Sequence, residues 1–260
     1  MYHDVAPTLP TKSGGASFFS VSQATFARQL SRIETLGLRG CSIADVISAG
    51  PANRVAISFD DGDLGQAARA FPALASRGMT ATFFITTDWI GRPGYASWSQ
   101  LREMAAAGMS IQSHTHSHPF LSELSADALR DELRRSRDIL DERLEQRTSM
   151  LALPGGDAPR ADLRGIMLEE GFTVVGTSRW GINRRVGGSV PLYVSRCTVK
   201  GDSTDAMFDA VVRGSAWLRV KKQSREGVLA FVRSTLGPTR YARWRRGFLD
   251  VANSSGAHRA

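Results

Sequence analysis

The chain has 260 residues, 42% of them apolar and 22% charged, so it can bury one substantial core and is too ordinary in composition to be disordered. No apolar run approaches the ~18 residues that a membrane span needs, and the first residues carry neither the basic nor the apolar region of a secretion signal. The two cysteines, Cys41 and Cys197, lie outside any CxxC spacing, which argues against a disulfide framework and a cysteine zinc site. We therefore expect a cytoplasmic protein that does not span a membrane.

The net charge of +8 is concentrated near the C-terminus. Residues 213–249 contain ten basic residues and one acid, interleaved with apolar and aromatic side chains. This pattern predicts a basic, helical C-terminal extension over residues 213–260, whose amphipathic helices could contact an anionic membrane surface. A terminal helical cap with a solvated basic face is the simpler interpretation, and nucleic-acid binding is not expected because no recognition motif accompanies the charge. Residues 1–212 form the expected folded domain.

Apolar runs alternate with helical patterns along this domain. Its first half predicts, in chain order, a strand at 2–5, helices at 22–36 and 42–49, a strand at 54–59, a helix at 66–76, a strand at 80–86 and a helix at 97–107. Its second half predicts a strand at 109–113, a helix at 126–144, a strand at 150–153, a helix at 161–170, strands at 172–176 and 191–195, and a helix at 205–212. Ser22 and Ser125 are the expected N-caps of two of these helices. Seven or eight strands that alternate with helices favour a parallel α/β architecture, either a closed or distorted barrel or a doubly wound sheet.

Polar residues directly follow three of the expected strands. Asp60 and Asp61 follow one, His-Thr-His-Ser-His follows the second at 114–118, and Pro-Gly-Gly follows the third at 154–156. In a parallel barrel the carboxyl ends of the strands converge on one face, where active sites are found. These groups, distant in sequence, can therefore be spatial neighbours.

The residue types at these strand ends suit metal-assisted hydrolysis. Two imidazoles and one carboxylate, with open positions for water and substrate, are a standard hydrolytic arrangement around a metal ion. His114 and His118 could supply two nitrogens if the segment turns helically after its strand, and either Asp60 or Asp61 could supply the oxygen. The other carboxylate could then remove a proton from the attacking water. A divalent ion would also relieve the repulsion between two acids buried together.

Taken together, three motifs resemble a known pattern. They are Ile-Ser-Phe-Asp-Asp-Gly at 57–62, Ser-His-Thr-His-Ser-His-Pro-Phe-Leu-Ser-Glu-Leu at 113–124 and Leu-Pro-Gly-Gly at 153–156. In order and separation they resemble the polysaccharide deacetylase family, which is also described as the NodB homology domain and carbohydrate esterase family 4. The resemblance spans about residues 2–195, and the first two motifs are the more specific.

The resemblance implies a deformed (β/α) barrel and a metal-dependent hydrolase that removes acetyl groups from an N-acetylated carbohydrate. The implied substrate is a polysaccharide, an oligosaccharide or a lipid-linked amino sugar. Asp60 would be the general base, while Asp61, His114 and His118 would bind zinc or a similar divalent metal. The backbone N–H of Gly155 would lie where the family places a donor to the oxyanion.

One expected residue of the family pattern is missing. Family members usually carry a late Leu-x-x-His motif whose imidazole protonates the leaving amine, and this chain has no histidine between His118 and His258. Its opening Tyr-His pair at 2–3 is similar instead to permuted members such as the poly-N-acetylglucosamine deacetylases. Because closure of a barrel makes the first and last strands neighbours, we expect His3 to be the general acid.

Other motif positions carry secondary expectations. The third motif lacks the arginine that many members use to hold the base, and Arg179 and Arg196 are candidates to replace it. Gly155 replaces a larger residue, which would open that wall of the site. By the same resemblance Thr115 would orient its loop by hydrogen bonding, and His116 falls at a variable position and is expected to be a neighbour of the metal site.

Two other classes of protein remain alternatives to the enzyme. One is a catalytically idle, metal-holding carbohydrate-binding module, against which the paired Asp60 and Asp61 argue because binding alone needs no base. The other is a membrane-surface or nucleic-acid-binding protein in which the basic extension carries the function.

Overall fold

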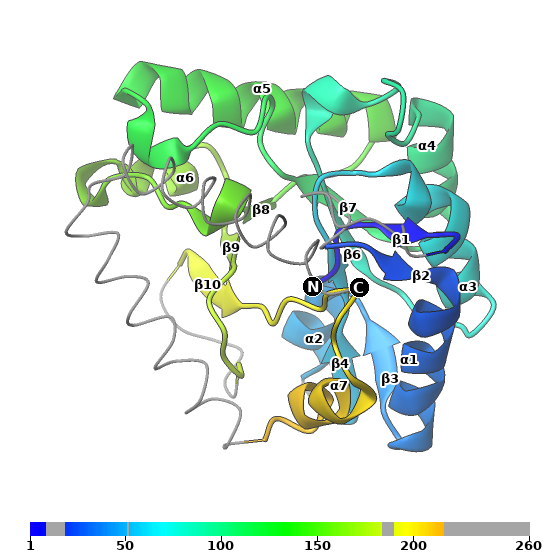
Figure 1. Cartoon of the computed structure of the whole chain (residues 1–260). Coiled ribbons are helices and arrows are strands. Elements are labelled where there is room, and N and C mark those ends of the chain that lie inside the picture. Colours follow the sequence, from blue (N-terminus) through cyan, green and yellow to red (C-terminus); the bar gives the residue numbers. More distant parts are fainter. Residues whose placement is uncertain (9–18, 51, 184–189, 216–260) are drawn as a thin grey trace, which may run out of the picture.

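The computed structural model describes residues 1–8, 19–50, 52–183 and 190–215. Its centre is a sheet of six parallel strands in the order β10-β9-β8-β7-β6-β5 (Figure 1). These strands are β5 (Ser58–Phe59), β6 (Thr82–Ile85), β7 (Ser110–Ser113), β8 (Met150–Ala152), β9 (Val174–Thr177) and β10 (Leu192–Ser195). The basic extension lies outside the described residues from 216 onward, so its helices stay a prediction.

The two edges of this sheet are joined by the first residues of the chain. Tyr2 forms a parallel bridge with Phe59 of β5, and the Val199 N–H, beyond β10, donates to the Met1 carbonyl at 2.9 Å. We call these two segments, residues 1–6 and 195–199, the closure seam. The seam turns the open sheet into a closed, irregular ring, which confirms the deformed barrel.

Two short parallel pairs extend this framework. They are β1 (Val5–Ala6) with β2 (Val21–Ser22) and β3 (Arg39–Cys41) with β4 (Arg54–Ala56). The single strand expected over residues 54–59 is therefore wrong, because the chain changes partner at Ile57. The Ile57 N–H donates to the Cys41 carbonyl at 2.9 Å and its carbonyl accepts from Thr82 at 3.0 Å. This apolar run therefore pairs with β3 before Ile57 and with β6 after it, so it contributes one strand to each of two sheets.

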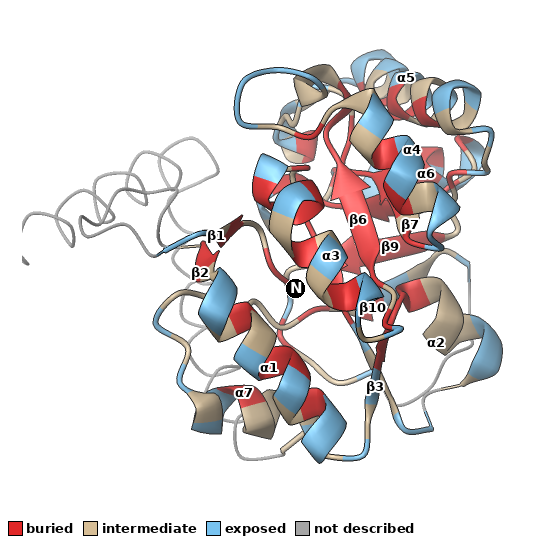
Figure 2. Ribbon diagram, turned by 90° about the vertical axis from the view of Figure 1, so that its right-hand side faces the viewer, coloured by how far each residue is buried: buried red, intermediate tan, exposed pale blue. Residues whose placement is uncertain are grey.

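Helices cover the outside of the ring, and in Figure 2 their outer faces are exposed while the strands are buried. They are α1 (Gln23–Thr35), α2 (Ile43–Ala49), α3 (Phe71–Ala75), α4 (Trp98–Ala106), α5 (Ala126–Leu144), α6 (Gly165–Glu169) and α7 (Asp205–Val212). Short 3₁₀ turns lie at Thr87–Trp89, Leu121–Glu123, Pro154–Gly156 and Ala161–Leu163. The expected N-caps are confirmed, since the Ser22 and Ser125 side chains accept from the N–H groups of Thr25 and Ala128.

The helix expected over residues 66–76 begins differently from the prediction. Its first turn, Gln66–Ala70, is a π-helix that leads into α3. Pro72 has no N–H, and its ring would clash with the carbonyl four residues earlier in a regular helix. The Phe71 N–H donates instead to the Gln66 carbonyl, five residues back, which is the wider π-helical hydrogen bond.

The core lies between the strands and the helices. The largest cluster of buried apolar side chains contains the fully buried rings of Phe26, Phe59 and Phe83, and the Phe59 and Phe83 rings stack with centroids 4.7 Å apart. This packing fixes the end of β5, and with it the residues that follow. Within the described part of the chain, none of the helices is long and apolar enough to cross a membrane.

Candidate active site

The carboxyl ends of β5 and β7 bring together three side chains that were expected to bind a metal ion. Asp61 follows β5, while His114 and His118 follow β7, two strands away in the sheet. The Asp61 Oδ1 atom lies 3.2 Å from His114 Nε2 and 3.5 Å from His118 Nε2. The structure thus gathers the three residues that were expected to be metal ligands.

The backbone at this site is strained. Five non-glycine residues among those described have a positive φ, and three of them are Asp61, Thr115 and His118, with φ of 79°, 68° and 63°. Such conformations cost about 1–3 kcal/mol each and cluster at functional sites. We infer that the backbone here gives up some stability in order to orient the side chains of Asp61 and His118.

The segment after β7 is a loop, so the helical turn suggested for His114 and His118 is wrong. The Thr115 hydroxyl, which was expected to orient this loop, accepts a hydrogen bond from the His118 N–H at 3.1 Å. Left-handed backbone at two positions, rather than a helix, makes the two rings converge, with centroids 4.9 Å apart.

Contacts outside the ligand cluster hold the same loop. His116 is not part of the cluster of Asp61, His114 and His118, and its Nδ1 lies 2.8 Å from the hydroxyl of Thr87. Ser117 is held from α5 by Glu132, which accepts from its N–H and its hydroxyl. The Trp89 ring packs against His118 with centroids 5.0 Å apart. Sequence patterns gave no signal for Glu132 or Trp89, because each acts through one long-range contact.

The three side chains fit a divalent metal ion. Their donor atoms all lie within 4.8 Å of one another, and ligands about 2.0–2.1 Å from a tetrahedral zinc ion are about 3.3 Å apart. The Nδ1 atom of His114 is 3.0 Å from the Ala152 carbonyl, which makes it the donor and leaves Nε2 free to ligate. Two imidazoles and one carboxylate are a common donor set for catalytic zinc.

Burial and neighbouring charges shift the pKa values of Asp61, His114 and His118. Burial alone would raise the pKa of Asp61, but the hydrogen bond and charge of His114 lower it below its ordinary value. Burial would lower the pKa of His114, but the hydrogen bond to Asp61 and the charge of Asp60 raise it. Burial and the charge of His114 lower the pKa of His118 to about 4. His118 is therefore neutral at pH 7, the form that binds metal.

Asp60, the expected base, lies beside this cluster and is paired with Arg196. The guanidinium of Arg196 donates to both carboxylate oxygens, at 2.5 Å to Oδ1 and 2.9 Å to Oδ2, and both side chains are buried. Burial alone would raise the pKa of Asp60, but the charge of Arg196 prevails and lowers the pKa to about 2. Asp60 is therefore an ionised, oriented proton acceptor at every ordinary pH.

Arg196, rather than Arg179, is the arginine that contacts the base. Its Nε also donates to the Thr177 carbonyl at 3.2 Å, and the guanidinium lies 5.0 Å from the centre of the Phe84 ring. A Cβ at Gly176 would lie 3.0 Å from Arg196 Nε, so glycine at that position gives the guanidinium room. Arg179 is exposed. The sequence left two candidates because the deciding contact joins residues 136 positions apart.

His3, the expected general acid, lies in the closure seam. Its ring packs against Phe19 with centroids 4.8 Å apart, and its Nδ1 is buried with no hydrogen-bond partner among the described residues. Burial lowers the pKa of His3, and the charges of Asp60 and Asp61 partly oppose this effect. A lowered pKa makes the imidazolium a stronger acid, although it forms only at lower pH.

Gly155 lies in the 3₁₀ turn that follows β8, with φ of 59°. A Cβ at this position would lie 3.2 Å from Cε1 of Phe120, whose side chain is 46% exposed. The wall that the missing side chain was expected to open is therefore covered in part by Phe120. The Phe120 ring thus lies next to the space that a larger side chain at position 155 would occupy.

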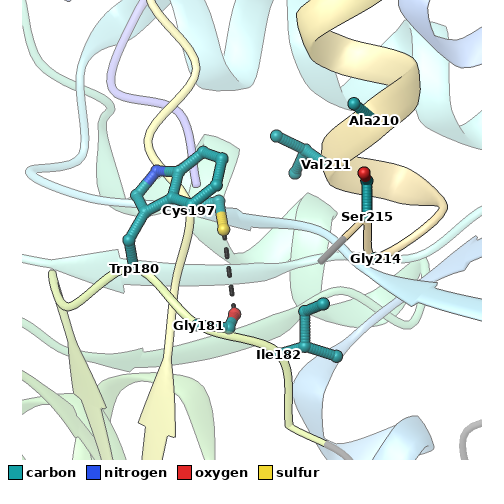
Figure 3. Close-up of a pocket in the computed structure, with 8 residues that line it drawn as sticks. All are labelled: Trp180, Gly181, Ile182, Cys197, Ala210, Val211, Gly214 and Ser215. Atoms are coloured by element: carbon teal, nitrogen blue, oxygen red, sulfur yellow. Dashed lines mark hydrogen bonds between the residues drawn. The ribbon is translucent and has the colours of Figure 1, made fainter. Parts of the chain in front are cut away.

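A cavity of about 10 Å³ lies beside the end of α7 and is separate from these residues (Figure 3). Trp180, Cys197 and Val211 are among its lining side chains, and Cys197 Sγ donates to the Gly181 carbonyl at 3.7 Å. A cavity of this size holds at most one water molecule, so it is no sugar site.

Comparison with known proteins agrees with this geometry. The family model described as polysaccharide deacetylase matches residues 48–175, the stretch that holds Asp60, Asp61, His114, His118 and Gly155. YxkH of Bacillus subtilis, which is named after the same family, is 35% identical over 102 residues, or 39% of this chain and 37% of its own length. A peptidoglycan-N-acetylglucosamine deacetylase of Bacillus cereus is 27% identical over 138 residues, or 52% of this chain and 47% of its own.

A solved structure extends the similarity beyond the matched stretch. IcaB from Ammonifex degensii superposes with a TM-score of 0.69 and 28% identity, over 82% of this chain and 93% of that one. By contrast, the chain spans less than half the length of the two curated relatives that it matches. Motifs, ring topology and family model agree in relating this chain to the polysaccharide deacetylase family, whose model matches residues 48–175.

Proposed function

We propose that this protein is a metal-dependent hydrolase that removes N-acetyl groups from a carbohydrate containing amino sugars. The observation that carries the proposal is the Asp60 carboxylate, held by Arg196 beside the cluster of Asp61, His114 and His118. A site that only held a metal ion would not need the Asp60 carboxylate in addition to Asp61. The name of the Bacillus cereus relative supports an N-acetylglucosamine polymer as the substrate class.

The proposed reaction is hydrolysis of the acetamide bond, and the chain supplies its proton transfers. A divalent ion held by Asp61, His114 and His118 would polarise the acetyl carbonyl and acidify the attacking water. Asp60 accepts the proton of that water as its oxygen adds to the carbonyl carbon. The Gly155 N–H donates to the oxyanion that develops.

The proposed second half of the reaction breaks the bond between carbon and nitrogen. An amine is a poor leaving group unless its nitrogen receives a proton as the bond breaks. We assign this proton to His3, which lies near enough to Asp60 and Asp61 for their charges to influence its pKa. The products are acetate and a free amino sugar.

The test is acetate release from N-acetylglucosamine oligomers, peptidoglycan fragments and lipid-linked amino sugars, joined to elemental analysis of the same protein. We expect release from at least one of these substrates, with one equivalent of a divalent metal bound. The matched control is Asp60→Asn, which keeps all three ligands. Equal activity of this variant and the wild type, or a wild type that releases acetate from none of the substrates, would overturn the proposal.

The basic residues after position 213 support a second, compatible proposal, namely contact with an anionic membrane surface. Such binding is electrostatic, so it should weaken steeply as salt rises. Association of the full chain with vesicles that contain anionic lipid, compared with a chain ending at Ser215, measures it. Binding that is equal for both chains would remove this proposal and leave the deacetylase proposal intact.

A further inference from the structure

One buried amide links the two residues to which the proton transfers are assigned. Gln66 is only 1% exposed, and its Nε2 donates to the His3 carbonyl at 2.8 Å and to the Asp60 carbonyl at 2.5 Å. Both partners are carbonyl oxygens, so the amide nitrogen must face them, which fixes the orientation of the side chain. Neither the motifs nor the reaction gave this residue a role.

The π-helical turn that carries Gln66 contacts the first strand of the chain at several places. Arg69, three positions further on the same turn, donates through Nε to the Val5 carbonyl. Gly65, just before the turn, allows a close approach, because a Cβ there would lie 1.9 Å from Asp4 Oδ1. One turn of helix thus holds residues 3–5 against the end of β5.

These contacts lie between the two short stretches of strand pairing formed by the first residues of the chain. Tyr2 pairs with β5, and Val5 pairs with β2, whose Val21 N–H donates to the Asp4 carbonyl at 3.0 Å. Among the strand hydrogen bonds of the described residues, none reaches the His3 carbonyl between them. The Asp60 N–H holds the peptide before His3 through the Tyr2 carbonyl, at 3.1 Å, and the hydrogen bond from Gln66 holds the His3 carbonyl after it. Gln66 therefore fixes the side of the His3 backbone that the strand pairing with β5 does not reach. Shifts of about 1 Å in such groups are large enough to slow a reaction about 100-fold.

The rest of the Gln66 amide argues against a purely stabilising role. Its Oε1 is buried and has no hydrogen-bond partner among the described residues. A buried acceptor without a partner is destabilising, so an apolar side chain of the same length would suit a simple core position better. A half-satisfied polar group in a core needs an explanation, and a positioning role supplies one.

We propose that Gln66 is a positioning residue that sets the place of His3, the donor to the leaving amine, relative to Asp60. The inference rests on the proposed function, because it assigns Gln66 a part in that reaction. It predicts a selective defect. Loss of the link should slow reactions that need a proton on the leaving group and spare those that do not.

The experiment compares two substrates with the variant Gln66→Met, which keeps the length of the side chain and removes its donor. One substrate is the N-acetylated sugar on which the wild type is most active, and the other is 4-nitrophenyl acetate, whose phenolate departs without a proton. We expect kcat for the amide to fall about 10- to 100-fold with KM within about threefold, since general acid catalysis is worth at least that much. Turnover of the aryl ester should change less than about threefold, because the base and the ligands stay in place.

Gln29→Met is the matched control. Gln29 is also fully buried, and it too carries one amide atom without a described partner. The difference is that Gln29 accepts a hydrogen bond from a side chain, the Tyr2 hydroxyl, whereas Gln66 donates to backbone carbonyls. We expect Gln29→Met to change hydrolysis of the amide and of the aryl ester to the same extent. If Gln66→Met does not fold, Gln66→Asn, which is too short to span both carbonyls, replaces it with the same expectations.

A double-mutant cycle with His3→Ala decides through which residue Gln66 acts. If it acts through His3, adding Gln66→Met to His3→Ala should slow amide hydrolysis by less than about threefold more. Full additivity, or an equal loss on both substrates, would overturn the inference. A wild type that hydrolyses no amide would instead overturn the proposed function, so the two failures are distinguishable.

Discussion

The ends of β5 and β7 and the closure seam contribute different halves of the candidate site, and they are built in different ways. The strand ends place Asp61, His114 and His118 by short loops after two parallel strands of one sheet, β5 and β7, which have β6 between them. The seam brings in His3 and Arg196, which meet the site only because the two edges of the sheet are joined. The ligand half is therefore local and robust, while the proton-handling half depends on contacts across almost the whole domain.

The strongest test of this contrast separates metal binding from turnover at the strand ends. His114→Ala removes one of three ligand atoms, and we expect bound metal near zero and deacetylation at background. Asp60→Asn should keep the metal and lose about 10²–10⁴-fold in kcat, because it removes the base alone. Metal analysis and acetate release on the same samples check both, and full metal occupancy in His114→Ala would contradict the assignment.

The next test breaks the seam half at Arg196. Arg196→Met leaves the Asp60 carboxylate buried and unpaired, and the free energy of unfolding should fall by about 3–5 kcal/mol at pH 7. Burial then raises the pKa of Asp60 above its present value of about 2, so the acid limb of kcat/KM should move to higher pH. The control is Arg179→Met, which alters an exposed side chain and should change neither quantity.

The sign of the matching stability effect follows from the lowered pKa. In the wild type the pair stabilises the fold above the unfolded pKa of Asp, about 3.9, and this stabilisation is lost as the pH falls towards about 2. In Arg196→Met the pKa of Asp60 is raised, so acidification should relieve part of the defect. Urea unfolding at pH 4 and pH 7 measures this, and a defect that is larger at pH 4 would contradict it.

A smaller effect is expected from His3→Ala. We expect deacetylation to fall about 100-fold, the usual scale for a general acid, with metal content unchanged. Hydrolysis of 4-nitrophenyl acetate should be nearly unaffected, since its leaving group needs no proton. An unchanged rate with the amide would show that the acid is another residue.

The smallest effect concerns the wall at Gly155. Its φ of 59° disfavours any side chain, and a Cβ would press on the Phe120 ring at 3.2 Å. Gly155→Ala should therefore cost about 1–2 kcal/mol of stability and lower Tm by a few degrees. Thermal unfolding checks this, and adding Phe120→Ala should recover only the part due to the ring contact.

The same contrast explains how much the sequence could predict. Asp61, His114 and His118, the proposed ligands, and Asp60, the proposed base, stand in short motifs at strand ends, where burial and turn residues mark the position. Residues 126–144 and 205–212 were predicted as helices with the bounds that α5 and α7 have, because caps and apolar spacing are local signals. A family resemblance then gave the deformed barrel.

Sequence reasoning failed where the physics is not local. The choice between Arg179 and Arg196 depended on a contact across the seam. The π-helical turn at Gln66 follows from the interplay of Pro72 with the carbonyls before it, which periodicity does not register. The loop after β7 needed left-handed backbone at Thr115 and His118, which is uncommon for any residue other than glycine and rare for a β-branched one such as Thr115.

The closure seam also determines the order in which the molecule should lose its properties. Met1 and Val199, which it joins, are separated by most of the folded chain, and contacts of such separation form late and are expensive to re-form once opened. Mild urea would therefore release the ends first. Such a chain would still bind the proposed metal ion at Asp61, His114 and His118. It would not hydrolyse the substrate, because His3 and Arg196 would no longer be in place.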